Sequence, residues 1–434
     1  MYKKRTVLLL GAGAVRDWDA PSTNDLTKLV RESGFYCKDN ETRITEFIFQ
    51  TLLKNGYDKN EINFETIINV IEELLIYYTH FDKDNGLSSL QKIFFCSKFE
   101  EELLNYSIEG GIEKDGYKLE IPKGNPYQFQ FCALNKETPS QYFLQILIVN
   151  LLTEINGSIN DYAYHTSEKN TEIFTDKKRE VNDFLIKWFG NQLFNENVLR
   201  IYTLNYDRVF KLLALKSGVD EMFEGFESGE ILKPGVVKKA EIQRIVTDFD
   251  CHCHYNLHGS IFWKIQTRDK NNLFNSELLL TPVPQFPCNL PEQPFIQIER
   301  GKSLLLTNII TGYQKAQRSF LPPFKQMHIA FDIDCLRADV LYIIGYSFGD
   351  EHINMSIKTT LKYNSNIKIH IIDPSYDERN GESGYELFKK VFINVFIFYL
   401  KFFDRKKISE TCIEYCKGKV VVHTISAKEF FKNA

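Results

Sequence analysis

The sequence has 434 residues, of which 43% are hydrophobic and 25% are charged, and its net charge is −4. This composition is that of a globular protein long enough for more than one domain, and the slight acidity argues against a nucleic-acid-binding surface. The 9 cysteines are irregularly spaced, unlike those of a disulfide-rich secreted domain, so we expect a reducing, cytoplasmic location.

The N-terminal segment predicts a buried strand followed by a glycine loop. Residues 6–10 are apolar and lead into Gly-Ala-Gly at 11–13. No cleavage site follows, so we do not interpret this segment as a secretory leader. Apolar residues then recur at helical spacing over 26–30, after Ser22 or Thr23, either of which can cap a helix. A strand, a glycine loop and a helix in this order predict the start of a nucleotide-binding βαβ unit.

The following stretch predicts helices. Apolar residues recur at helical spacing over 44–52, 67–78, 141–152 and 181–189. Asn63 is a candidate N-cap, and residues 110–126 indicate a loop or small hairpin. We therefore expect a mainly helical insertion at 36–190 within a core formed by residues 1–35 and 191–434.

Strand character returns after the insertion. Short β-branched runs occupy residues 198–203, 251–257, 340–344, 367–372 and 420–425. Most of them end in small or polar residues, as strands do when their carboxyl ends line a ligand crevice. The sequence thus predicts an α/β fold: a Rossmann-like parallel sheet with a large helical insertion domain. The apolar run at 391–403 is shorter than the roughly 20 residues of a membrane span, so we expect no membrane segment.

Four short blocks follow these predicted strands. They are Gly-Ala-Gly at 11–13, Thr-Leu-Asn-Tyr-Asp at 203–207, Leu-His-Gly at 257–259 and Gly-Tyr-Ser-Phe-Gly-Asp at 345–350. In this order they resemble the sirtuin superfamily of NAD-binding proteins, and most of all its bacterial antiphage-defence branch. The chain has no Cys-x-x-Cys pair, so it lacks the zinc ribbon of the deacylase members.

The resemblance implies roles for individual residues. Asn205 and His258 match the catalytic residues: the amide orients a ribose hydroxyl or a water, and the histidine, which titrates near neutral pH, takes a proton. The glycines allow backbone N–H groups to approach a diphosphate. Asp373 ends a predicted strand where a carboxylate can accept from a ribose hydroxyl. The residues expected to contact NAD are Gly11, Ala12, Gly13, Thr203, Asp207, Gly345, Ser347 and Asp373.

The expected activity is an NAD glycohydrolase that takes NAD as its substrate, needs no metal and releases nicotinamide and ADP-ribose. The missing zinc ribbon favours water as the acceptor. The resemblance implies an antiphage-defence effector that acts by NAD depletion, forms a homo-oligomer and is restrained by a partner such as a DNA-translocase-type ATPase. Two alternatives share the same cofactor site: an ADP-ribosyltransferase or deacylase of the sirtuin type, and a non-catalytic nucleotide-sensing subunit.

A Cys-His-Cys-His run at 251–254 offers a second interpretation. On a strand, the two cysteines face one side and the two histidines the other, so either pair could chelate a metal. No matching second pair lies nearby in sequence, and we favour packing over a metal site.

Overall fold

The computed structural model describes residues 3–78, 101–113, 115–122, 124–125, 128–132, 138–163, 178–228, 237–267, 276–287, 295–299, 302–310, 321–376 and 405–434. The apolar run at 391–403 lies outside these residues.

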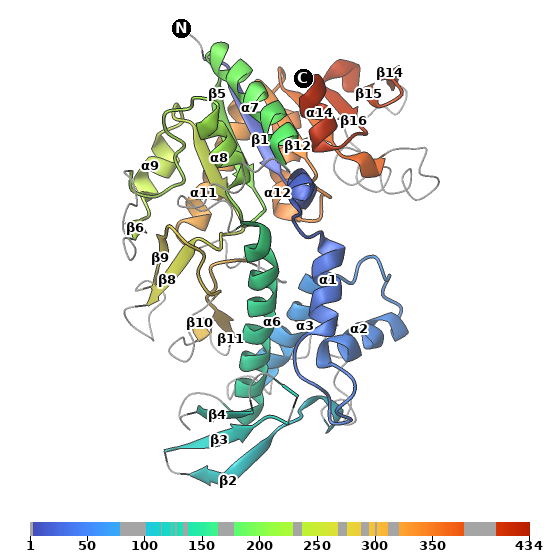
Figure 1. Ribbon diagram of the computed structural model, residues 1–434, viewed down its shortest axis with the longest axis vertical. Helices are drawn as coiled ribbons and strands as arrows, with labels where there is room; N and C mark the ends of the chain where they lie inside the picture. Colours follow the sequence, from blue (N-terminus) through green and yellow to red (C-terminus); the bar gives the residue numbers. More distant parts are fainter. Residues whose placement is uncertain are drawn as a thin grey trace.

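A mixed sheet forms the centre of the protein (Figure 1). Its strands, in spatial order, are β14 (Lys406–Ser409), β15 (Cys412–Tyr415), β16 (Val420–His423), β13 (Lys368–Ile372), β12 (Val340–Ile344), β1 (Arg5–Leu10), β5 (Val198–Thr203) and β7 (Cys253–Asn256). The strands from β16 to β7 are parallel, and β14 and β15 add an antiparallel hairpin at one edge. From β1 the chain moves outward through β5 and β7, then returns to the other side of β1 for β12, β13 and β16. This is the strand order of the Rossmann fold, as predicted, and its switch point lies between β1 and β12.

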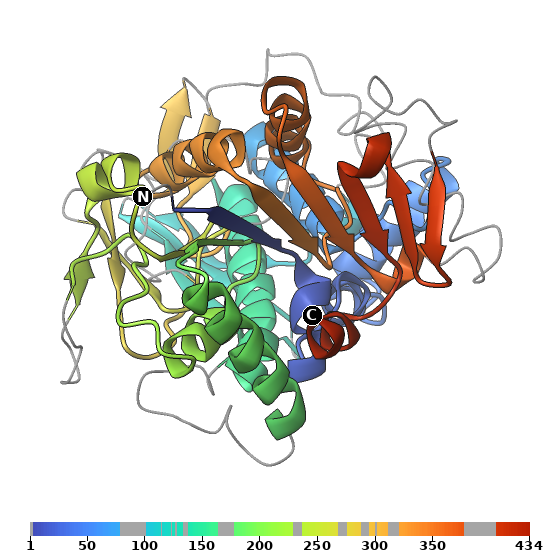
Figure 2. The ribbon, with the colours of Figure 1, turned by 90° about the horizontal axis from the view of Figure 1, so that it is seen from above.

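Alternate residues of the parallel strands supply two separate cores. Val7 and Leu9 of β1 belong to the first, and Leu8 and Leu10 to the second. Helices cover both faces, as a parallel sheet requires (Figure 2). The first core includes side chains of α9 (Ile242–Thr247), α11 (Phe324–Arg337) and α12 (Glu351–Tyr363). The second includes those of α7 (Arg179–Phe194), α8 (Val209–Lys216) and α14 (Ala427–Asn433).

A buried charge network joins the sheet to α11. The Asp334 carboxylate is fully buried and accepts hydrogen bonds from Arg5 Nη1 at 2.8 Å and from Arg200 Nε at 2.5 Å. The Tyr202 hydroxyl also donates to it, at 2.5 Å. Because these charges are paired and hydrogen-bonded, the network fixes β1 and β5 against one helix.

A helical layer lies beyond the carboxyl ends of the parallel strands (Figure 1). It consists of α1 (Thr23–Glu32), α2 (Ile44–Lys54), α3 (Phe64–Tyr77) and the long α6 (Pro139–Ala163). These helices confirm the prediction of helices that was made from the spacing of apolar residues. α6 is long and apolar enough to cross a membrane by length and composition, but 72% of its most apolar stretch is buried within the protein. Its hydrophobicity is therefore that of a core helix.

Smaller elements complete the described chain. Antiparallel strands β2 (Ser107–Glu113), β3 (Gly116–Glu120) and β4 (Phe129–Cys132) lie near the far end of α6, where the sequence indicated a loop or hairpin (Figure 1). One further small sheet contains β6 (Lys238–Lys239), β8 (Trp263–Thr267) and β9 (Ser276–Leu280). Another contains β10 (Phe295–Glu299) and β11 (Lys302–Leu305). Short 3₁₀ helices are η1 (Ala12–Trp18), η6 (Pro374–Tyr376) and η9 (Cys416–Gly418).

The connection after β1 differs from the predicted βαβ unit. The glycine loop leads into η1, and the α-helix that follows, α1, packs against α2, α3 and α6. Ser22 caps α1 in a reciprocal capping box with Asp25, which confirms one of the two predicted caps. Hydrophobic spacing locates an apolar face but does not say what covers it, so the sequence could not assign α1 to the helical layer. The division into a core and an insertion at 36–190 stays a prediction, and α7 crosses its second boundary while packing on the sheet.

Candidate functional site

A cavity of about 540 Å³ lies at the switch point, between the strand ends and the helical layer. Its sheet side is formed by loops that follow β1, β5, β7, β12 and β13. The predicted site residues in its wall are Gly11, Ala12, Gly13, Asn205, His258, Gly345, Ser347 and Asp373. Thr203 and Asp207 lie behind the wall and are buried. The topology thus brings together residues that are hundreds of positions apart in the chain.

The glycine loops after β1 and β12 touch through their backbones. The Gly11 N–H donates to Ile344 O, and the Gly13 N–H donates to Gly345 O, both at 2.9 Å. A Cβ on Gly11 would lie 2.4 Å from Gly345 O. The sequence suggested that N–H groups of this loop bind a diphosphate, but those of Gly11 and Gly13 hold the two loops together instead. These glycines are therefore required first for the contact that shapes the cavity.

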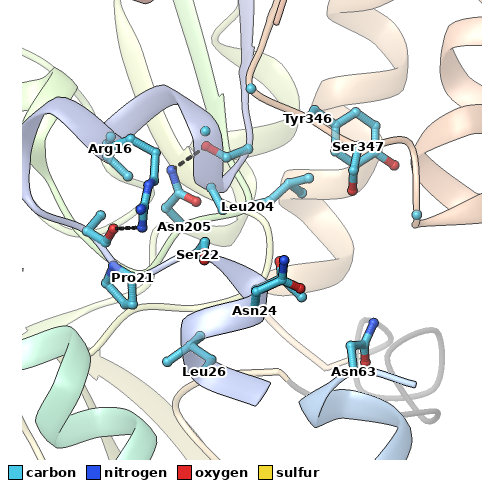
Figure 3. Close-up of a pocket in the computed structure, with 18 of the residues that line it drawn as sticks. Arg16, Pro21, Ser22, Asn24, Leu26, Asn63, Leu204, Asn205, Tyr346 and Ser347 are labelled. Carbon is cyan, nitrogen blue, oxygen red and sulfur yellow. Dashed lines mark hydrogen bonds between the residues drawn. The ribbon is translucent and has the colours of Figure 1, made fainter. Parts of the chain in front are cut away.

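Asn205 projects from the loop after β5 with its side-chain orientation fixed (Figure 3). Its Nδ2 donates to Gly11 O at 2.9 Å, and its backbone N–H donates to Thr203 Oγ1 at 3.0 Å. Asn256 Nδ2 donates to the backbone carbonyls of Asn205 and Asp207, at 2.9 and 3.1 Å. Because Nδ2 is held by Gly11, Oδ1 is the atom of this amide that can accept a hydrogen bond from a ligand. Thr203 supports the loop from behind.

His258 follows β7 and is 4% exposed in the cavity wall. The backbone on either side is anchored: the Leu257 N–H donates to Thr203 O, and His258 O accepts from the Ile310 N–H. The ring centroid of His352 lies 6.0 Å from that of His258, and His328 lies 5.1 Å from His352. Burial lowers the pKa of His328 to about 4, so this ring is neutral at pH 7. His258 therefore lines the cavity and belongs to a cluster of three histidine rings.

Asp207 joins the Asn205 loop to two helices. Its Oδ1 accepts from the Val209 N–H at 2.8 Å, at the start of α8, and its Oδ2 accepts from the Tyr162 hydroxyl of α6 at 2.9 Å. The pKa of this carboxyl is raised by burial, and its hydrogen bonds with Val209 and Tyr162 offset part of that increase. The structure thus places Asp207 as a support for the loop.

The loops after β12 and β13 form the opposite wall. Ser347 is exposed toward the cavity, next to the Tyr346 ring (Figure 3). The Tyr346 hydroxyl donates to Asp350 O or Asn354 Oδ1, each 3.1 Å away, which ties this loop to α12. Asp373 Oδ1 accepts from the backbone N–H and the hydroxyl of Ser375, at 2.9 and 2.7 Å, and burial raises the pKa of this carboxyl.

Sequence reasoning missed the helical side of the cavity. The beginnings of α1 and α3 and the end of α6 contribute Ser22, Thr23, Asn24, Leu26, Asn63, Phe64, Glu65, Ile159 and Tyr162. Asn63 Oδ1 accepts from the N–H groups of Glu65 and Thr66, which confirms the predicted cap. Caps can be predicted from sequence, but the direction in which a capped helix end faces cannot.

Among the described residues that line the cavity, Arg16 is the only lysine or arginine, and the lining also includes the carboxylates of Glu65, Asp350 and Asp373. Its Nη1 donates to Ala20 O at 2.6 Å and to Asp25 Oδ2 at 2.8 Å, so the guanidinium is engaged with the start of α1 (Figure 3). The charged side chains in this part of the wall therefore give it no net positive charge, and a bound diphosphate would depend on N–H and hydroxyl donors.

Within the described ranges, no group of three or more His, Cys, Asp and Glu side chains is arranged to hold a metal. The Cys-His-Cys-His run lies at β7: Cys253 and His254 are buried in the sheet, and His252 Nδ1 accepts from the Leu199 N–H at 3.1 Å. Three of the four side chains of this run therefore have burial or hydrogen-bonding roles in the sheet.

Comparisons with known proteins leave the family open. No family model and no curated protein matches the sequence. Among solved structures, the chain is similar to one described as the crystal structure of a Sir2 homolog–NAD complex, with 13% identity and a TM-score of 0.31, over 90% of this chain and 91% of that one. These values transfer no ligand and no activity, so the functional argument depends on the site itself.

Proposed function

We propose that the protein binds NAD in the switch-point cavity and hydrolyses the nicotinamide–ribose bond, releasing nicotinamide and ADP-ribose. The observation that carries this proposal is the convergence of Asn205 and His258, from separate strand ends, on one cavity beside the paired glycine loops. Rossmann-type sheets bind dinucleotides in the crevice at the switch point, and a cavity of about 540 Å³ is in the usual range for a ligand of this class.

The chemistry requires little acid or base strength. When the bond between C1′ of the ribose and the pyridinium nitrogen breaks, both electrons leave with nicotinamide, which departs neutral, and positive charge develops on the ribose. Water adds its oxygen to C1′ and loses one proton. Such oxocarbenium-like transition states depend mainly on holding the sugar and the water in place.

Asn205 and His258 would divide these tasks. The Asn205 amide is held through Nδ2 by Gly11 O, so its Oδ1 can accept from a ribose hydroxyl or from the attacking water. An amide does this without titrating. The His258 imidazole, in the same cavity wall, can accept the proton that the water or hydroxyl loses. Water is the proposed acceptor because the chain has no Cys-x-x-Cys pairs to build the ribbon of a protein-deacylating cleft.

The motif resemblance extends the proposal to the cell. A defence effector that depletes NAD must be restrained until infection, and a homo-oligomer or a partner of the DNA-translocase ATPase kind would supply that restraint. Cells that express the protein should lose NAD on phage challenge, and cells that express the Asn205→Ala variant should retain it. Equal NAD levels in both would contradict this role while leaving the enzymatic proposal to the assay below.

The direct test is NAD turnover by the purified chain, with products separated by chromatography. Asn205→Ala and His258→Ala should each lower kcat by about 10²- to 10⁴-fold. Asn195→Ala is the matched control, because this exposed asparagine ends α7 and donates to Asn191 O. Label from NAD appearing on protein would favour ADP-ribosyl transfer. NAD that is bound but never cleaved, with equal binding by all variants, would contradict the hydrolase and favour a sensor.

A further inference from the structure

The Tyr162 hydroxyl connects the helical layer to the loop that holds Asn205. Tyr162 lies in the last turn of α6, lines the cavity, and donates to Asp207 Oδ2 at 2.9 Å. Asp207 is two positions after Asn205 and 3% exposed. A hydrogen bond is electrostatically stronger in a buried, low-dielectric environment than in water.

Other hydrogen bonds of this loop come from β1, from Asn256 of β7, and from segments after β7 that contact Tyr206. The Leu204 N–H donates to Leu10 O, and Asn256 holds the carbonyls of Asn205 and Asp207. These bonds fix where the loop begins and where its carbonyls face. The Asp207 side chain adds contacts at the far end of the loop, to α8 through the Val209 N–H and to α6 through Tyr162.

We propose that Tyr162 is a positioning residue, which holds the Asn205 amide in its working orientation through Asp207. The helical layer thereby becomes part of the catalytic arrangement as well as a wall of the cavity. This inference rests on the proposed hydrolysis of NAD.

Loss of the Tyr162 hydroxyl should affect the turnover of NAD more than its binding. The backbone hydrogen bonds between the glycine loops do not involve Tyr162, so we expect them to persist when its hydroxyl is removed. The orientation of Asn205 matters most when charge develops on the ribose. Loss of the hydroxyl should therefore lower kcat and leave KM nearly unchanged.

The experiment compares Tyr162→Phe with Tyr142→Phe. Both remove one hydroxyl from the same helix, but the Tyr142 hydroxyl donates to Phe131 O at 3.1 Å, near the small β2–β4 sheet and away from the cavity. Tyr162→Phe should lower kcat about ten- to a hundredfold, the effect of a slightly misplaced group, with KM for NAD within about twofold of the wild type. Tyr142→Phe should match the wild type. Equal loss in both variants, or a change confined to KM, would overturn the proposal.

A double-mutant cycle shows whether Tyr162 acts through Asp207. In an Asp207→Ala background, Tyr162→Phe should cost much less activity than it does in the wild type, because the group that accepts from the hydroxyl is absent. Independent, multiplying effects would contradict the proposed route. If Tyr162→Phe unfolds at assay temperature, Asp207→Ala removes the other partner of the same hydrogen bond, and a kcat equal to that of the wild type would contradict the proposed route.

Hydrogen exchange gives a measurement that needs no substrate. Amides of residues 204–209 should exchange faster in Tyr162→Phe than in the wild type, and at the wild-type rate in Tyr142→Phe. Unchanged exchange in Tyr162→Phe would refute the positioning role. If the wild type does not cleave NAD, the proposed function fails, while exchange still decides whether Tyr162 holds the loop.

Discussion

Substitution of Gly345 by alanine tests how the two glycine loops form the site. Gly345 has a φ of 59°, in the left-handed region that residues with a Cβ rarely adopt. A Cβ there would lie 2.3 Å from both Ala14 N and Gly13 C. These are backbone atoms at the start of η1, so a rotamer change cannot relieve the overlap.

The expected loss of stability is the sum of a conformational cost and a steric cost. A left-handed conformation costs a residue with a Cβ about 1–2 kcal/mol, and overpacking against a fixed neighbour typically costs about 1–3 kcal/mol. Gly345→Ala should therefore lower the free energy of unfolding by about 2–5 kcal/mol, a large part of the ~5–15 kcal/mol of a typical domain. Movement that relieves the overlap must separate the loops after β1 and β12, so NAD binding should weaken as well.

Urea unfolding and NAD titration measure the two effects. Gly349→Ala is the matched control, because this glycine also lines the cavity and the nearest atom to its added Cβ is Ser347 Oγ at 3.8 Å. The control should stay within about 0.5 kcal/mol of the wild type. If Gly345→Ala and Gly349→Ala have the same urea midpoint and the same NAD affinity, backbone contact between the two loops does not shape this site.

Two further predictions concern charge. Asp373→Asn should raise kcat/KM for NADP relative to NAD by about tenfold or more, because the carboxylate that suits a ribose hydroxyl repels a 2′-phosphate; an unchanged ratio would remove Asp373 from the adenosine side of the site. His370 Nδ1 and His423 Nε2 lie 2.9 Å apart, and burial with nearby positive charge lowers their pKa values to about 3 and about 4. Unfolded histidines take up protons below about pH 6.5 and these folded ones do not, so acid favours the unfolded chain. Stability should therefore fall by roughly 3–4 kcal/mol between pH 7 and pH 5, about half of it from each histidine. As the pH falls across that range, the urea midpoint should fall less steeply for His423→Gln than for the wild type. Equal slopes would contradict the lowered pKa values of these histidines.

Much of the sheet could be predicted because its strands carry strong local signals. Residues 198–203 and 340–344 are apolar, β-branched and end in polar blocks, and both are strands in the structure. The edge hairpin β14–β15 was not predicted, since all four residues of β14 are exposed and the alternation in β15 extends over only four residues. The sheet side of the cavity was predictable for the same reason: parallel strands bring their carboxyl ends to one edge.

The helical side of the cavity depends on packing between distant segments. Tyr162 lies outside the apolar run at 141–152 that predicted its helix, and its bond with Asp207 joins positions far apart in the chain. Asn63 was predictable as a cap, but its place in the cavity wall follows from how α3 packs against α1 and α6. A single sequence contains no signal for such contacts, because periodicity describes one helix at a time.

The position of the cavity between the strand ends and α1, α3 and α6 links ligand affinity to the state of the helical layer. A ligand that touches both sides favours the arrangement in which they are closed together, and any molecule that stabilises the same arrangement raises the ligand's affinity. Thermodynamic reciprocity requires the ligand to raise that molecule's affinity by the same factor. A ligand in this cavity would therefore stabilise the packing of the helices against the sheet, and the protein should resist unfolding better with the ligand bound.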